Sequence, residues 1–155
     1  MLSIEQTREV NELTALNQDI QDWHASHFPH EFKPFDPVSM DSAFRNILDQ
    51  KDSFAFVAKL DNKPIGYILC FIKIRSENAF QYKKSIMLID QIMVKSEHRN
   101  KGIGKKLIAE VEKLAKQLNI SDLQLDFWEA NKLAAHFFTN SGFKTFRIYM
   151  EKHII

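Results

Sequence analysis

Apolar residues recur along the chain with two periods, and those periods predict its helices and strands. Four stretches are expected to be helical. In the first and third of them apolar residues recur at steps of three and four residues, which is typical of amphipathic helices. The two shorter stretches follow the N-cap candidates Ser39 and Asn131, and Gly142 stands where a left-handed residue would end the last helix. The expected helices are residues 4–24, 40–48, 102–118 and 131–140.

Shorter apolar runs, rich in aromatic and β-branched residues, predict strands. Two of them flank the turn sequence DNKP, which contains Pro64, and should form an antiparallel hairpin. The segment HFPHEFKPFDP holds Pro29, Pro34 and Pro37 and predicts a non-helical connection. At the N-terminus we expect at most a very short strand, at residues 2–4. The expected strands are residues 54–60, 65–74, 86–94 and 123–128, followed by a final strand or hairpin at residues 143–151.

The order of these elements predicts a mixed-sheet α/β or α+β domain. Strand–helix–strand alternation after residue 86 implies parallel pairing there, whereas the hairpin implies antiparallel pairing earlier in the chain. With 155 residues the chain has the length of one domain, so we expect a single domain over residues 1–155.

Composition and charge narrow the class of protein. The chain has 45% hydrophobic and 26% charged residues, as in an ordinary soluble globular protein. Its 21 Lys and Arg against 20 Asp and Glu leave a net charge of +1, which gives no global field for gathering nucleic acid or an anionic membrane. We find neither a signal peptide nor an apolar run near the roughly 20 residues that span a bilayer. We therefore expect a cytoplasmic protein that binds neither nucleic acid nor membrane.

The most specific feature is the loop VKSEHRNKGIGKK, between the strand that ends near Val94 and the helix that begins near Gly102. Helix N-termini favour anions, and ordinary helices place Asp or Glu in the first turn. This helix instead has lysines around its start and no acidic residue until Glu110. Gly102 and Gly104 lack a Cβ, so their backbone can approach a ligand closely. The pattern predicts a phosphate-binding loop; the alternative is a flexible glycine entry to a solvated basic face.

Two common phosphate-binding motifs do not fit this loop. A Walker A sequence needs glycine where Arg99 stands and Ser or Thr where Lys106 stands. A dinucleotide-binding fingerprint needs a third glycine at the position of Leu107.

Two blocks of sequence resemble the GNAT superfamily of N-acetyltransferases. Arg99-x-x-Gly102-x-Gly104, after an apolar strand, resembles the acyl-CoA-binding signature Q/R-x-x-G-x-G/A of that family. A later block resembles the pattern N-x-x-A-x-x-F-Y-x-x-x-G-F and consists here of Asn131, Ala134, Phe137, Phe138, Gly142 and Phe143. The resemblance is specific from about residue 54 to residue 151 and extends to the N-terminal part only in the type of element.

The resemblance implies a mixed, mostly antiparallel sheet flanked by helices, in which the strands at 86–94 and 123–128 splay apart. The co-substrate acetyl-CoA would lie there, its pantetheine arm paired with the backbone of Ile92 and Val94. Asn131 would contact acetyl-CoA from the start of the helix at 131–140, and Phe138 would also be among the residues that bind acetyl-CoA. The pyrophosphate would be held by backbone amides of Arg99, Asn100, Lys101, Gly102, Ile103, Gly104 and Lys105.

Asp90 is the catalytic candidate. It interrupts the apolar strand IMLIDQIMV, where a carboxylate is costly unless it is paired or functional. The resemblance implies a general base here, often acting through water; the alternative is a carboxylate in a solvated cleft or in an ion pair. Phe138 stands where many family members have the tyrosine that protonates the leaving thiolate, and it is expected to be a core aromatic instead. Water, Tyr149 or unassisted departure remain open as substitutes.

Other chemically capable residues have simpler explanations. Asp126, Trp128 and Glu129 end a strand beside the same cleft, and Asp126 and Trp128 share one strand face that could line an acceptor pocket for a cation. We favour the simpler interpretation that they are packing and capping residues. Cys70 is the single cysteine, which excludes an intramolecular disulfide, and it should be a small buried hydrophobe.

Three histidines have a spacing that invites comparison with a zinc site. They are followed by no Cys or carboxylate cluster, and Pro29 interrupts the helix that would align them. We therefore expect no metal at His24, His27 and His30.

The leading functional hypothesis is an N-acetyltransferase in which an amine attacks acetyl-CoA directly. The alternative is a sensor module that binds acetyl-CoA or CoA with little catalysis, and Phe138 motivates it. The acceptor loops expected from the resemblance are HASHFPHEFKPFDP and SENAFQYKKS. Their composition suits polyamines, aminoglycosides, peptide N-termini and small metabolites alike. The oligomeric state, a homodimer included, is left open.

Overall fold

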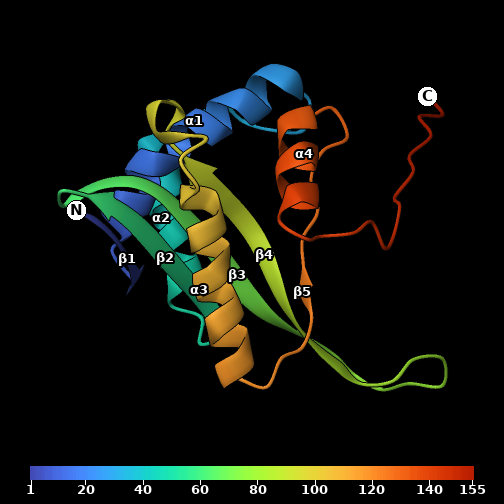
Figure 1. The fold of residues 1–155 in the computed structure, drawn as a ribbon. Coiled ribbons are helices and arrows are strands. Elements are labelled where there is room, and N and C mark those ends of the chain that lie inside the picture. Colours follow the sequence, from blue (N-terminus) through green and yellow to red (C-terminus); the bar gives the residue numbers. More distant parts are fainter. The chain divides into compact units, whose positions relative to one another are not determined.

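The computed structural model describes residues 1–155, which divide into two units, residues 1–125 and 126–155. The first unit is built on a five-stranded sheet in the order β1-β2-β3-β4-β5 (Figure 1). The first three pairs are antiparallel and the β4–β5 pair is parallel. The strands are β1 (Leu2–Thr7), β2 (Ser53–Leu60), β3 (Lys63–Arg75), β4 (Lys84–Val94) and β5 (Leu123–Gln124).

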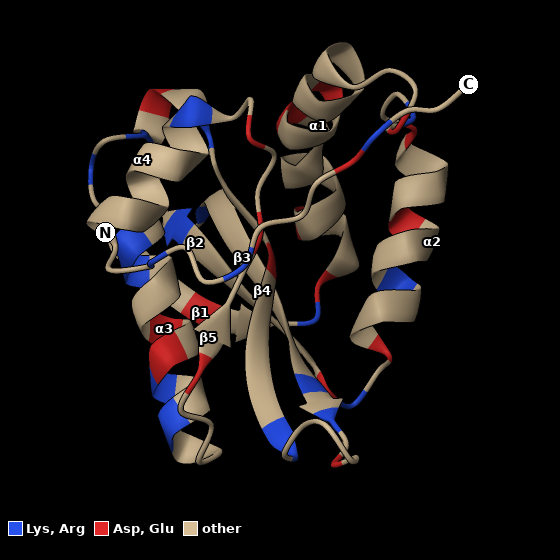
Figure 2. Cartoon of the chain, turned by 90° about the vertical axis from the view of Figure 1, so that its right-hand side faces the viewer, with Lys and Arg blue, Asp and Glu red and all other residues tan.

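Helices cover both faces of this sheet. On one face lie α1 (Val10–His27) and α2 (Pro37–Leu48), and on the other lies α3 (Ile103–Gln117), as Figure 2 shows. Strand side chains alternate between the two faces, so the α1–α2 side receives Ala55, Val57, Tyr67, Leu69 and Met93 from the sheet. The sequence-based fold class is confirmed: an α+β fold with a mixed sheet, in which α3 crosses over between the parallel strands β4 and β5.

The N-terminus differs from its prediction. Residues 2–7 form a full edge strand, in register from Leu2 opposite Leu60 to Thr7 opposite Ala55, and the helix begins only at Val10. Both the helix start at residue 4 and the very short strand were therefore wrong. The cause is tertiary: β1 gains hydrogen bonds from the free edge of β2, and no local pattern reveals that edge.

The second helix also begins earlier than predicted. Asp36 is its N-cap and accepts a hydrogen bond from the Ser39 amide at 2.8 Å, so Ser39 lies inside the helix. Pro37 is the first helical residue, where its missing N–H costs nothing and its fixed φ suits the helix. The prediction that the whole proline-rich segment is non-helical was wrong at this residue.

The hairpin and the apolar strand agree with prediction, but the last strands do not. The β2–β3 turn consists of Asp61 and Asn62, both with positive φ, as expected for a two-residue turn. The expected strand 123–128 shortens to Leu123–Gln124, and the expected strand 143–151 is absent as regular structure. No strand partner is available to these residues within their own unit, so their apolar alternation does not produce a ladder.

The unit 126–155 contains the helix α4 (Lys132–Asn140). Asn131 caps it by accepting a hydrogen bond from the Ala134 amide at 3.0 Å, and Gly142 follows its end with a φ of 89°. Both the N-cap and the left-handed glycine predicted from the sequence are confirmed. No helix in the structure is long and apolar enough to cross a membrane.

Candidate active site

The loop before α3 forms the strongest candidate site for an anion. Gly102 is the N-cap of α3, with a left-handed φ of 77° that disfavours any residue with a side chain. No side chain caps this helix, and its first turn contains no acidic residue. The first helical hydrogen bond is donated by Lys106, so the amides of Ile103, Gly104 and Lys105 have no partner in the chain. These groups carry the positive end of the helix dipole.

Four basic residues precede or begin α3 close to those amides in the sequence: Arg99, Lys101, Lys105 and Lys106. Two of them fold back on the loop: Arg99 Nε donates to the Val94 carbonyl at 2.9 Å, and Lys101 Nζ donates to the Glu97 carbonyl at 3.0 Å. Lys105, in the first turn, and the adjacent Lys106 are exposed. The loop therefore has local positive charge even though the net charge of the chain is only +1.

A bulge in β4 determines which backbone groups of that strand remain unpaired. Leu69 of β3 lies opposite Gln91 and Cys70 lies opposite Ile89, so Asp90 is the extra residue. Beyond the bulge, the Lys95 amide donates to Ile65 in β3 at 2.9 Å. Because antiparallel pairs alternate, the backbone groups of residues 92 and 94 point away from β3.

The side of β4 that faces away from β3 is only partly covered by β5. The two strands pair at Met87–Leu123 and Leu88–Gln124, and the Met87 amide donates to the Asp122 carbonyl at 2.9 Å. Within residues 1–125, no strand pairs with β4 beyond that point. The backbone of Ile92 and Val94 therefore faces a side of β4 with which no strand of residues 1–125 pairs, called here the opened side of β4. The splay of the strands at 86–94 and 123–128 stays a prediction, because residues 126–128 belong to the other unit.

Asp90 is exposed, not buried. The bulge turns it out of the alternation of β4, which explains how a carboxylate fits into such an apolar strand. It lies close enough to Tyr67 for its charge to affect that hydroxyl: burial, and secondarily the negative charge of Asp90, raise the pKa of Tyr67, while a hydrogen bond from Asn17 opposes the rise.

A buried polar cluster beneath α1 was missed by the sequence analysis. It joins Asn17 of α1, Tyr67 of β3 and Gln91 of β4. The signal was available in part, since Asn17 sits within the apolar stripe of α1 and Gln91 interrupts the same apolar run as Asp90. Their mutual contact depends on residues 50 and 74 positions apart, which no local pattern reveals.

Two further predicted site residues belong to the unit 126–155. The Asn131 side chain is engaged in capping α4, as described above. Phe138 is 6% exposed and contacts three other rings, with centroid distances of 5.8, 5.2 and 5.8 Å to Phe127, Phe137 and Phe143. The interpretation of Phe138 as a core aromatic is confirmed for its place within this unit.

The histidines occupy ring stacks at the end of α1. His24 stacks on Phe32 with centroids 4.5 Å apart, and His27 stacks on Trp23 at 4.1 Å. Burial, and secondarily the proximity of His27, lower the pKa of His24. No group of three or more His, Cys, Asp or Glu side chains is arranged to hold a metal ion.

The structure also gives the surroundings of the other chemically capable residues, Cys70, Asp126, Trp128 and Glu129. Cys70 is buried, and burial raises its pKa to about 12, so the thiol is neutral. Asp126 and Glu129 are exposed, and Glu129 forms an ion pair with Lys132. Trp128 is 40% exposed.

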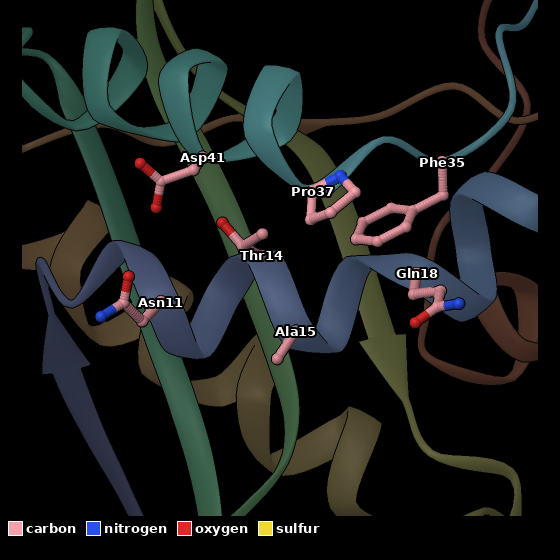
Figure 3. Close-up of a pocket in the computed structure, with 7 residues that line it drawn as sticks. All are labelled: Asn11, Thr14, Ala15, Gln18, Phe35, Pro37 and Asp41. Carbon is pink, nitrogen blue, oxygen red and sulfur yellow. The ribbon is translucent and has the colours of Figure 1, made fainter.

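A cavity of about 450 Å³ lies between α1 and α2 (Figure 3). None of the predicted catalytic or cofactor-binding residues lines it, but Phe35 and Pro37 of the expected acceptor loop do. Its α1 residues include Asn11, Ala15 and Gln18, which lie on the outer side of a helix whose Leu13 and Leu16 face the sheet. The loop before α3 and the opened side of β4 combine unpartnered amides, cations and a carboxylate, so we place the candidate active site there. The cavity is lined by Asn11, Thr14, Ala15, Gln18, Phe35, Pro37 and Asp41.

Known proteins are similar to this chain in sequence and in fold. The chain is 30% identical over 113 residues to streptothricin acetyltransferase A of Bacillus subtilis (strain 168), covering 72% of this chain and 58% of the relative. It is 26% identical over 103 residues to aminoglycoside N(6')-acetyltransferase type 1 of Klebsiella pneumoniae, covering 64% of this chain and 51% of the relative. The chain thus spans little more than half the length of these relatives.

Solved structures give the same picture of the fold. A tetramutant of the BH1408 protein from Bacillus halodurans superposes with a TM-score of 0.89 at 17% identity, covering 99% of each chain. Aminoglycoside N-acetyltransferase AAC(6')-Iy in complex with CoA superposes with a TM-score of 0.75 at 18% identity, covering 99% of this chain and 95% of that one. At such identities the likeness concerns the fold alone.

The match to a family model covers most of the chain. The model described as the acetyltransferase (GNAT) family matches residues 17–143, a range that includes the bulge, the glycine loop and α4. The chain therefore belongs to the GNAT family of acetyltransferases.

Proposed function

We propose that this chain is an N-acetyltransferase that moves the acetyl group of acetyl-CoA to a small-molecule amine, with residues 1–155 acting as one acetyltransferase domain. The observation that carries the proposal is the start of α3, where three unpartnered amides and exposed lysines meet around a left-handed glycine. Such an arrangement suits a pyrophosphate. Family membership supports acetyl-CoA as its source.

The residues of the loop and of β4 divide the binding between them. The amides from Asn100 to Lys105 hold the pyrophosphate, because the Arg99 amide predicted to join them already donates to the Ser96 carbonyl at 3.2 Å. Lys105 adds a positive charge. The backbone of Ile92 and the amide of Val94 accept the pantetheine arm as an added strand, because these groups point away from β3. The Val94 carbonyl is already bonded to Arg99, which ties the end of the strand to the loop.

Acetyl-CoA supplies an activated acyl group whose leaving group is a thiolate. The amine must be neutral to attack, so a base has to accept a proton from the incoming ammonium. Asp90 is exposed at the bulge and takes this role, directly or through water. The new bond joins the amine nitrogen to the acetyl carbon, and the C–S bond breaks with its electron pair going to sulfur.

The proton for the thiolate does not come from Phe138, which has none to give. A thiol with a pKa of about 8.5 leaves as a thiolate without the help of an acid, so the missing acid does not prevent the reaction. The acceptor is a small-molecule amine, as the names of the streptothricin and aminoglycoside relatives suggest.

The same fold without efficient chemistry is the second candidate, and the phenylalanine at position 138 favours it. Purified protein is incubated with acetyl-CoA and a panel of amines, and free CoA thiol is measured. Release of thiol with at least one amine supports the enzyme. Binding of acetyl-CoA without release supports the sensor, and absence of both overturns the proposal.

A further inference from the structure

The polar cluster beneath α1 has one defined hydrogen-bond order. The Tyr67 hydroxyl donates to Gln91 Oε1 at 2.5 Å. Asn17 Nδ2 donates to the Tyr67 oxygen at 2.9 Å and to Gln91 Oε1 at 3.2 Å. Tyr67 is 0% and Asn17 3% exposed, whereas Gln91 is partly exposed. Gln91 is thus the outer end of a buried network.

A polar network of this kind lowers the stability of a hydrophobic core. Tyr67 belongs to the apolar cluster of Leu13, Leu16 and Leu69, and Asn17 Oδ1 is buried there without a hydrogen-bond partner. A buried polar atom without a partner destabilises the fold, and apolar residues of similar shape would avoid that cost. The arrangement therefore calls for a function other than stability.

The network determines the orientation of the Gln91 amide. Both of its bonds use Oε1, so the Nε2–H₂ group points the other way and donates to no group of the chain. Without the Tyr67 and Asn17 donors, this amide could rotate and present either its oxygen or its nitrogen. With them, Gln91 presents donors only.

The place of Gln91 in the strand connects the network to the candidate active site. It follows Asp90 at the bulge and precedes Ile92, whose backbone faces the opened side of β4. Its side chain lies on the α1–α2 face of the sheet, as its bonds to Asn17 and Tyr67 show.

We propose that Gln91 binds the amine acceptor, donating from Nε2 to a hydroxyl or ether oxygen near the reacting amine, and that Tyr67 and Asn17 are its positioning residues. The inference rests on the proposed function. It narrows the acceptor to hydroxylated amines, because an amide N–H needs an oxygen or other acceptor atom. A protonated polyamine offers only donors to this position.

The test compares three variants with the wild type. Gln91→Met removes the donor, Tyr67→Phe removes only the hydroxyl that orients it, and the double variant combines them. Phe44→Leu is the matched control, because the Phe44 ring packs edge-to-face on Tyr67 with centroids 6.1 Å apart and has no polar side-chain atom that could join the hydrogen bonds of the network. The acceptors are sisomicin, streptothricin and glucosamine, with spermidine as the oxygen-free comparison.

We expect Gln91→Met to raise KM for the best hydroxylated acceptor about tenfold and Tyr67→Phe to raise it about fivefold, the range of one or two hydrogen bonds. KM for acetyl-CoA should not change. The double variant should equal Gln91→Met, since Tyr67 acts through Gln91. Phe44→Leu should lower the melting temperature with no change in KM.

Four outcomes overturn the inference. They are an unchanged acceptor KM in Gln91→Met, additive effects in the double variant, a Tyr67→Phe variant that behaves like Phe44→Leu, and a wild type that prefers spermidine. If Tyr67→Phe fails to fold, Gln91→Met decides alone, because its side chain is partly exposed. A wild type that acetylates no amine at all overturns the proposed function itself, and this result is distinct from the four.

Discussion

Two regions of the first unit, the glycine loop and the buried polar network, differ in exposure, in charge and in how the chain assembles them. The glycine loop before α3 is contiguous, exposed and basic, and it offers three amides to an anion. The network of Asn17, Tyr67 and Gln91 is assembled from three distant segments, is buried at two of its three members and carries no formal charge. The loop suits attraction of a highly charged co-substrate. The network suits selection among neutral or weakly charged groups by hydrogen-bond geometry.

Asp90 precedes Gln91 in β4 and lies outside the glycine loop, so its substitution separates chemistry from binding of the co-substrate. We expect Asp90→Asn to lower kcat by about 10² to 10⁴, the usual contribution of a general base, because the amide cannot accept the ammonium proton. Binding of acetyl-CoA should be unchanged. The measurements are steady-state thiol release and titration calorimetry.

Asp19→Asn is the control for that experiment, since Asp19 is an exposed carboxylate on α1. It should leave both quantities unchanged. A kcat in Asp90→Asn within a factor of two of the wild type would remove Asp90 from the mechanism and leave only the contrast between loop and network.

These regions also differ in how far the sequence could predict them. The loop was predictable because its charges and glycines are adjacent, and the helix caps at Asn131 and Gly142 are equally local. The β4 strand was found, but not its bulge: one extra residue leaves no trace in an apolar run, although it decides that Asp90 is exposed and that Ile92 faces the opened side.

Elements that depend on distant partners were missed. The β1 strand exists because β2 offers an edge, and β5 is short because its pairing with β4 ends after two residues. Asn17 had the pattern of a polar residue that happens to fall in an apolar helix stripe. Only the proximity of Tyr67 and Gln91 gives it a role.

Salt concentration should change ligand binding at the loop but not at the network, by a smaller factor than the change in kcat expected for Asp90→Asn. Screening weakens the attraction between exposed lysines and phosphates, so the Kd of acetyl-CoA should rise about three- to tenfold between 50 mM and 500 mM NaCl, values chosen to shorten the screening length by roughly a factor of three. The factor by which Gln91→Met raises the acceptor KM should be the same at both concentrations. A Kd that does not respond to salt would contradict an electrostatic role for the loop.

The smallest expected effect concerns the far end of α1, outside both regions. Burial lowers the pKa of His24 in the folded state below its ordinary value of 6.5. The unfolded chain therefore binds this proton more readily, so the stability that neutral His24 contributes is present above pH 6.5 and is lost as the pH falls below it.

Melting temperatures at pH 7.5 and pH 5.5 check this sign. The wild type should lose more stability on acidification than His24→Gln, whose side chain does not titrate, by roughly one or two degrees. Equal losses in the two proteins would show that protonation of His24 does not oppose folding.

The central claim is that the start of α3 binds the pyrophosphate of acetyl-CoA, and a thermal melt tests it most directly. The ligands are acetyl-CoA, CoA, ATP and NAD, and the proteins are the wild type, Gly102→Glu and Gly142→Glu. Gly142 is the matched control, because it shares the left-handed φ and the open surroundings of Gly102. Both variants should lose stability from backbone strain alone.

A ligand at a hundred times its Kd adds about 2.7 kcal/mol, or roughly 5 to 10 °C for a chain of this size. The account predicts that shift for acetyl-CoA and CoA alone, in the wild type and in Gly142→Glu but not in Gly102→Glu. A shift with none of the ligands, a shift with ATP or NAD instead, or an undiminished shift in Gly102→Glu would contradict it.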